Sequence, residues 1–112
     1  MSQSSGFGVF GTGLRSNILV ALALLEESHA SELARILGAG LTTVRNAMDT
    51  LEQVGLIAGR VEGNTRRVRL NPRYWAQAEL KALLEKLALG DPELMNRVGD
   101  LRRRPRRVGK AL

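Results

Sequence analysis

The sequence predicts a mainly α-helical domain that carries one small β-hairpin. Two observations support this fold class. Apolar residues recur at helical spacing in two consecutive segments, the first ended by Gly38 and the second by Gly55. Two short strand-like runs, 56–62 and 65–70, then flank Gly63-Asn64, a dipeptide suited to a tight turn. The expected order is therefore helix, tight turn, second helix and two-stranded hairpin.

The turn between the two helices has the small residues that a steep helix crossing needs. Ala34 offers only a methyl group where the helices would cross. Gly38 can adopt the left-handed conformation that ends the first helix abruptly. Val44, Met48 and Leu51 recur at i, i+4 and i+7, so they mark the buried side of the second helix. This is the helix-turn-helix pattern, whose second helix enters the major groove of DNA.

The exposed side of the second helix is predicted to be polar near its N-terminus. Arg can read guanine, Asn can read adenine, and Leu or Thr can contact the methyl group of thymine. Asp49 lies on the same side, where it would repel phosphate unless it bonds to cytosine or pairs with Arg45. The alternative interpretation is an ordinary solvated helix surface. The residues expected to read bases are Leu41, Thr42, Arg45 and Asn46.

The predicted hairpin is rich in arginine. Residues 60–69 hold four Arg against one Glu, and a basic patch of this kind is typical of phosphate contact. A solvated basic hairpin is the alternative. Val61 and Val68 are expected to face the core, and Ser31 to cap the first helix of the pair. The residues expected to contact the DNA backbone are Ser31, Thr43, Arg60, Asn64, Thr65, Arg66 and Arg67.

With these features, residues 14–90 resemble the winged-helix domain of the ArsR-type bacterial regulators and their MarR-type relatives. The resemblance implies a homodimeric, cytoplasmic transcriptional regulator that binds double-stranded DNA sequence-specifically. Gly40 stands where the family usually has a Ser or Thr cap. ArsR-type metal sensors use cysteines or clustered histidines, so metal binding is not implied here. The matching residues are Ser31-Glu32-Leu33-Ala34, Val44, Leu51, Gly55-Leu56-Ile57 and 67–72.

Two other predicted helices are apolar on more than one face. The first is 14–27, and the second runs to Leu89 from Asn71-Pro72, a cap followed by a proline at the first helical position. A helix that is apolar all round is buried all round, and a small domain has little material to cover it. A second copy of the chain is the expected cover, as the resemblance also implies. The expected interface residues are Leu19, Ala23, Trp75, Leu83 and Leu87.

The 112 residues are enough for one domain with short arms. We expect a flexible glycine-rich arm over 1–13, a winged helix-turn-helix domain with dimerisation helices over 14–90, and a short helix with a basic tail over 91–112. Six of the 17 basic residues lie in 102–112, which leaves 11 basic and 11 acidic side chains elsewhere. The net charge of +6 therefore belongs to the tail.

Composition also limits the possible functions. The chain has no Cys, no signal-peptide pattern, and no apolar run longer than Ile18–Leu25, so we expect a cytoplasmic protein outside the membrane. His29 is the single histidine and is expected on a short third strand, 28–30, beside the hairpin. No catalytic set, metal site or cofactor is predicted. The alternative function is a protein-interaction module on the same scaffold, the partner of a separately encoded enzyme.

Overall fold

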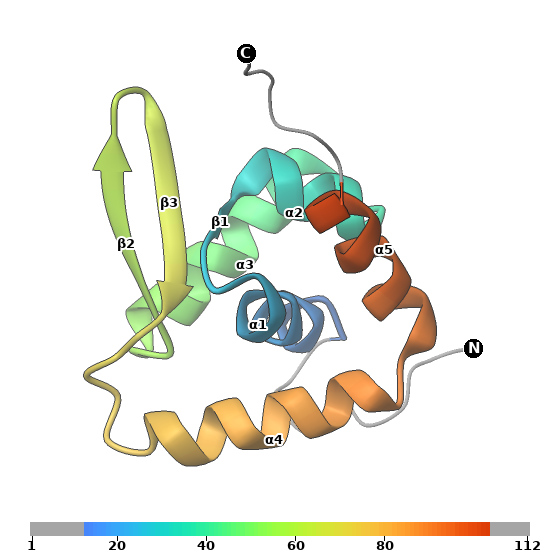
Figure 1. Ribbon diagram of the computed structural model, residues 1–112. Coiled ribbons are helices and arrows are strands. Elements are labelled where there is room, and N and C mark those ends of the chain that lie inside the picture. The colour runs from blue at the N-terminus through green and yellow to red at the C-terminus, as the bar shows by residue number, and fades with distance from the viewer. Residues whose placement is uncertain (1–12, 104–112) are drawn as a thin grey trace.

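The computed structural model describes residues 13–103, which form five helices and a three-stranded antiparallel sheet (Figure 1). The predicted mainly α fold class with a small sheet is confirmed, and the arrangement is compatible with a winged helix. The predicted arm and most of the predicted basic tail lie outside the described residues. The elements are α1 (Gly13–Leu25), β1 (Ser28–His29), α2 (Ala30–Leu37), α3 (Leu41–Gln53), β2 (Ile57–Glu62), β3 (Thr65–Leu70), α4 (Gln77–Leu89) and α5 (Pro92–Arg103).

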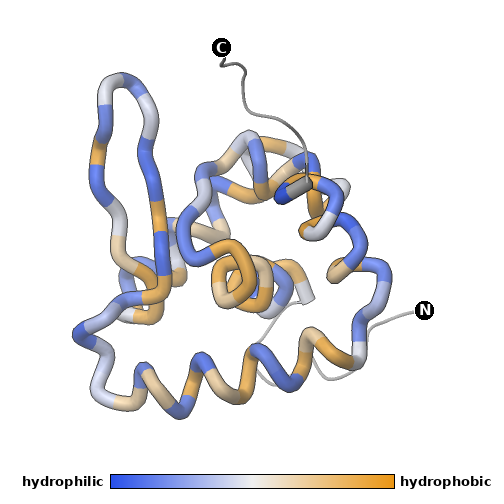
Figure 2. Tube along the Cα trace, viewed as in Figure 1, coloured by the Kyte–Doolittle hydropathy of each residue, from blue (hydrophilic) through white to orange (hydrophobic). Residues whose placement is uncertain are grey.

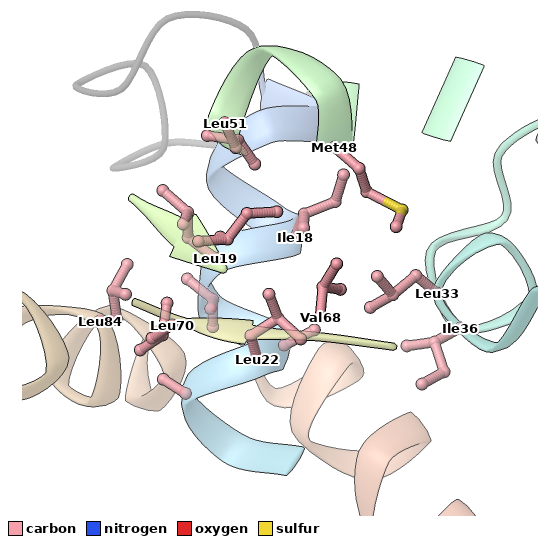
Figure 3. Packing of buried hydrophobic residues seen from close by; sticks show 14 of the residues in the cluster. Ile18, Leu19, Leu22, Leu33, Ile36, Met48, Leu51, Val68, Leu70 and Leu84 are labelled. Atoms are coloured by element: carbon pink, nitrogen blue, oxygen red, sulfur yellow. The ribbon is translucent and has the colours of Figure 1, made fainter. Parts of the chain in front are cut away.

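Helix α1 forms the centre of the molecule. It contacts α2, α3, α4, α5 and β3, and every residue from Ile18 to Ala23 is at most 5% exposed. Figure 3 shows Ile18, Leu19 and Leu22 among side chains from α2, α3, β3 and α4. The prediction that Leu19 and Ala23 lie at a dimer interface is therefore wrong. The chain's own elements cover α1 on all sides, so these two residues belong to the core of a single copy.

The α2–α3 pair has the predicted tight turn. Gly38 takes the left-handed conformation at φ 64°, and the backbone N–H of Ala39 donates to the carbonyl of Ala34 at 3.0 Å. Helix α3 begins after Gly40, which supplies no side-chain cap. On α3, Val44, Met48 and Leu51 are buried as predicted.

The start of α2 differs from the prediction. His29 occupies the N-cap position and makes no side-chain cap bond, so Ser31 is already inside the helix and exposed. The hydroxyl of the buried Ser28 instead donates to the Glu32 carboxylate at 2.6 Å. The chain enters α2 directly from β1, so the helix begins before Ser31 can act as its cap.

The sheet has the strand order β1–β3–β2. The predicted third strand is confirmed, because Ser28 pairs with Val68 and His29 with Arg67. The β2–β3 hairpin, hereafter the hairpin, turns through Gly63-Asn64, and Gly63 alone of the two has a positive φ, 63°. Its base is apolar and its outer part is polar (Figure 2).

Only one of the two hairpin valines faces the core. Val68 is fully buried, whereas Val61 is 76% exposed, which corrects the prediction for Val61. Both side chains lie on the same face of the hairpin, where Val61 pairs with Arg66 next to the turn. The base of this face packs on α1 and α3, and its tip extends past the apolar body.

Helix α4 starts later than Asn71-Pro72 predicted. The side-chain carbonyl of Asn71 accepts from the backbone N–H of Arg73, and its amide donates to the carbonyl of Gly55, both at 2.9 Å. Asn71 therefore closes a local turn and ties the end of β3 to the end of α3, and the helix begins only at Gln77. Next along the chain, α5 continues through Gly99 and buries Leu94 and Val98, while Asp91 accepts a bond from the N–H of Leu94.

None of the helices within residues 13–103 has the length and apolar character that would let it cross a membrane.

Candidate nucleic-acid interface

A groove lies between the start of α2, one side of α3 and the turn of the hairpin. It gathers predicted site residues that are far apart in the sequence: Ser31 from α2, Arg45 from α3, and three residues from the hairpin. Such convergence of polar side chains from separate elements is typical of a binding surface. The full lining is His29, Ala30, Ser31, Arg45, Met48, Asn64, Thr65 and Arg66.

The predicted base-reading residues are accessible on the described chain. Leu41, Thr42, Arg45 and Asn46 are all exposed in the N-terminal part of α3, as is the predicted backbone contact Thr43. They share one polar side because the opposite side of α3 is packed in the core. Of the four, only Arg45 also lines the groove.

Arg45 differs from the hairpin arginines in its pairing. It forms no ion pair with any residue of 13–103, so its guanidinium is available to a ligand. Asp49 lies one turn further along α3 and pairs with Arg66 instead of Arg45. Of the two partners that the sequence suggested for Asp49, a cytosine or Arg45, the second is therefore not the one observed.

Arg66 joins the hairpin to α3. Its Nη1 lies 2.9 Å from Oδ1 of Asp49, and its Nη2 lies 2.6 Å from Oε1 of Glu52. Partial burial disfavours the charged guanidinium, but the hydrogen bonds that Arg66 donates to Glu52 and Asp49 outweigh that effect and raise the pKa of Arg66. Arg66 is therefore held as a cation between two carboxylates of the same chain.

The other face of the hairpin has a second ion-pair cluster. Glu27, in the link between α1 and β1, accepts hydrogen bonds from Arg60 on β2 and from Arg67 on β3, the latter at 3.2 Å. Glu62 lies 3.5 Å from Arg60 and 3.7 Å from Arg67. The hydrogen bonds from Arg60 and Arg67 lower the pKa of Glu27, and Glu27 in turn raises the pKa of Arg60. This cluster joins both strands of the hairpin to the end of α1.

These contacts correct the prediction that the hairpin is a free basic patch. Three of its four arginines, Arg60, Arg66 and Arg67, are paired with carboxylates. Arg69 is the exception among the described residues, since it has no ion pair there and is exposed. The sequence count missed the pairing because Glu27, Asp49 and Glu52 all lie outside residues 60–69.

Gly59 provides the space that the α3–hairpin contact requires. A Cβ atom at this position would lie 3.2 and 3.4 Å from the two carboxylate oxygens of Glu52. The absence of a side chain on β2 therefore lets the Glu52 carboxylate lie close to the strand while it pairs with Arg66. No motif in the sequence pointed to this role of Gly59.

His29 is half-buried on its strand, as predicted, and lines the groove. Its Nδ1 atom is buried and has no hydrogen-bond partner within the described part of the chain. Residues 13–103 contain no group of three or more His, Asp or Glu side chains arranged to hold a metal ion.

The remaining predicted interface residues lie on or beside α4, away from the groove. Trp75 is 88% exposed in the turn before α4, where its ring lies 5.8 Å from that of Tyr74. Leu83 is 43% exposed and Leu87 is half-buried. These three residues are accessible in a single copy, and their place at an interface stays a prediction.

No protein-family model matches this chain, and no curated protein matches it in sequence.

Proposed function

We propose that the protein binds double-stranded DNA through α3 and the groove beside it, as a sequence-specific regulator of transcription that acts as a homodimer. The observation that carries this proposal is the groove itself, which brings Ser31, Asn64 and Thr65 together with Arg45, a side chain that has no ion pair within residues 13–103. Base edges demand a hydrogen-bonding side chain on a rigid element, and phosphates accept bonds from hydroxyl and amide groups around it. The groove offers both in adjacent positions.

The dimensions of α3 fit this role. Thirteen residues make a helix about 20 Å long, and the major groove is about 12 Å wide. In the proposed complex, Leu41, Thr42, Arg45 and Asn46 contact base pairs, with Arg45 on a guanine. Ser31, Thr43, Asn64 and Thr65 contact the sugar-phosphate backbone, and Arg69, which has no ion pair among the described residues, adds charge at the hairpin.

The homodimer is the second part of the proposal. Trp75, Leu83 and Leu89 favour it, because they are large apolar side chains exposed on or just before α4 that a second copy could cover. A two-fold dimer would present two α3 helices to half-sites about 34 Å apart. The mass of the protein in solution tests this part without DNA. Leu83→Glu is expected to halve a dimer mass and to leave the fold intact, since Leu83 is already partly exposed.

In vitro selection tests the whole proposal. The full chain is mixed with a pool of random duplexes at low and at physiological salt, and the bound fraction is sequenced. We expect one enriched motif, with two related half-sites about one helical turn apart. A pool that stays random at both salt concentrations, or no retention of DNA, would overturn the proposal.

A protein-interaction module is the second candidate, and the paired hairpin arginines favour it. Because Arg60, Arg66 and Arg67 are neutralised by their own chain, the hairpin attracts phosphate less than its sequence suggests. Isolation of the protein from cells, with and without nuclease treatment, distinguishes the DNA-binding regulator from the protein-interaction module. Enriched DNA that carries one motif supports the regulator, whereas a stoichiometric protein partner that survives nuclease supports the interaction module.

A further inference from the structure

We propose that Asp49 and Glu52 lower the affinity of the interface for DNA, because they compete with DNA phosphates for the guanidinium of Arg66. The inference rests on the proposed DNA-binding function and adds to it a built-in competitor. The phosphate contacts that any DNA sequence offers would be weakened, while the base contacts of α3 would keep their full strength.

The geometry of Arg66 is the first step. Both terminal nitrogens of its guanidinium are engaged, one by Asp49 at 2.9 Å and the other by Glu52 at 2.6 Å. Paired Arg–carboxylate contacts use the same donors that would bind a phosphate. Arg66 lines the groove, so a phosphate that enters there meets an arginine with a carboxylate already at each of its two terminal nitrogens.

The second step concerns the strength of the ion pairs that Arg66 forms with Asp49 and Glu52. They are close enough to compete with a phosphate, and exposed enough for a phosphate to replace them. The side chains of Arg66, Asp49 and Glu52 are 35%, 65% and 41% exposed. Ion pairs with this exposure contribute little to stability, so DNA can displace the carboxylates. Gly59 keeps room for the Glu52 carboxylate beside β2, which holds the competitor in place when DNA is absent.

The third step concerns discrimination. Binding to unrelated DNA depends mainly on phosphate contacts, whereas recognition of one site adds contacts to bases. Arg66 must give up two carboxylates to gain a phosphate, so it adds little to either kind of binding. Arg45 has no such competitor among the described residues and contributes in full wherever its base is present. Asp49 and Glu52 therefore lower the affinity for a specific site and for unrelated DNA by about the same factor, and discrimination between the two rests on Arg45 and the other base contacts.

The experiment compares two double variants that change the net charge equally. Asp49→Asn/Glu52→Gln frees Arg66, and Glu79→Gln/Glu85→Gln removes two exposed carboxylates from α4. The dissociation constant of each is measured for the selected duplex and for a scrambled duplex over a range of salt. Unfolding curves confirm that both variants are folded.

We expect the Asp49→Asn/Glu52→Gln variant to bind scrambled DNA about three- to tenfold more tightly than the α4 control, roughly the effect of releasing one exposed arginine. Its plot of log affinity against log salt should steepen by about 0.9, the value for one added phosphate contact. The affinity for the selected duplex should rise by a similar factor, so the ratio of specific to non-specific affinity should stay nearly unchanged. Adding Arg66→Ala to this variant should remove the gain, whereas Arg66→Ala in the natural chain should change scrambled-DNA binding much less.

Equal affinities and slopes for the two double variants would overturn this inference and leave the proposed function standing. A gain that persists after Arg66→Ala would also overturn it, since the effect would then come from charge alone. Binding of no duplex by the natural chain or by any variant would overturn both the inference and the proposed function. Should the double variant not fold, Glu52→Gln with Glu85→Gln as its control makes the same comparison.

Discussion

Helix α1 and the hairpin are positioned by different forces. Helix α1 is apolar and its central part, from Ile18 to Ala23, lies inside the chain, where packing from five other elements fixes it. The hairpin is anchored by packing only at its base, and two ion-pair clusters, centred on Glu27 and on Arg66, join it to α1 and α3. Figure 2 shows the contrast along the chain, with an apolar α1 and a mostly polar hairpin. The core should therefore be insensitive to salt and pH, and the hairpin sensitive to both.

The largest expected effect is in α1. Leu19→Ala should lower the free energy of unfolding by about 2–5 kcal/mol, because the substitution opens a cavity in a fully buried site. The free energy is measured by chemical denaturation at two protein concentrations at least tenfold apart. Equal losses at both concentrations are expected for a core residue. A loss that grows as the protein is diluted would instead show that Leu19 lies at a dimer interface.

The second largest effect should be a difference in stability between a substitution at the base of the hairpin and one near its tip. Val68→Ala should cost about 1–3 kcal/mol, the range for a buried apolar truncation, while Val61→Ala should stay within about 0.5 kcal/mol, as for an exposed residue. The two variants remove the same atoms from the same face of one hairpin. Similar losses of unfolding free energy for the two variants, in thermal or chemical denaturation, would show that the tip of the hairpin is packed as well as its base.

A smaller effect on the free energy of unfolding should appear when the Glu27 carboxylate is protonated at low pH. The pKa of Glu27 in the folded chain lies below its ordinary value of 4.5, because Arg60 and Arg67 donate hydrogen bonds to its carboxylate. A lowered pKa of this kind stabilises the fold above the ordinary value, and the contribution disappears as pH falls through the folded pKa. Glu27→Gln should thus be less stable than the natural chain at neutral pH, and the difference should disappear only as pH falls through the folded pKa of Glu27, which lies below 4.5.

Chemical denaturation across pH 2 to about 7 measures this difference, a range that spans ordinary carboxylate titration. Glu85→Gln on α4 serves as the control for the change in net charge. A difference between Glu27→Gln and the natural chain that stays constant with pH would mean that the carboxylate is not held by the arginines. Added salt should also shrink the difference at neutral pH, since the pairs are partly exposed.

The parts of the fold that depend on neighbouring residues were predictable from the sequence. Gly38 ends α2 in the left-handed conformation, Gly63 turns the hairpin, and the apolar stripe of α3 is buried as its spacing predicts. Each of these follows from backbone sterics or from helical periodicity within a few residues.

The parts that depend on distant residues were not predictable. The apolar surface of α1 correctly predicted burial, yet it could not reveal that the chain's own helices provide the cover. Asn71-Pro72 matches a helix start, but its amide finds Gly55 across the fold and the helix begins six residues later, at Gln77. Glu27 is 33 and 40 residues from Arg60 and Arg67, so no local pattern could pair them.

The candidate site follows the same division. The exposed polar side of α3 was predicted from periodicity, whereas only the structure shows that Arg45 lines one groove with Ser31, Asn64 and Thr65. The net charge around the hairpin was not predicted, because carboxylates from α3 and from the α1–β1 link neutralise its arginines. Counting charges within one segment overestimated its attraction for phosphate.

The most direct measurement is the binding of Arg45→Ala to the selected duplex and to the same duplex with one base pair changed at a time. Lys86→Ala, which removes a cation from α4, is the control. We expect Arg45→Ala to lose about 1–3 kcal/mol on the selected duplex and to lose discrimination at a single base pair in each half-site, with Lys86→Ala close to the natural chain. An Arg45→Ala loss that is the same for every duplex, or no larger than that of Lys86→Ala, would contradict the assignment of α3 as the helix that reads DNA.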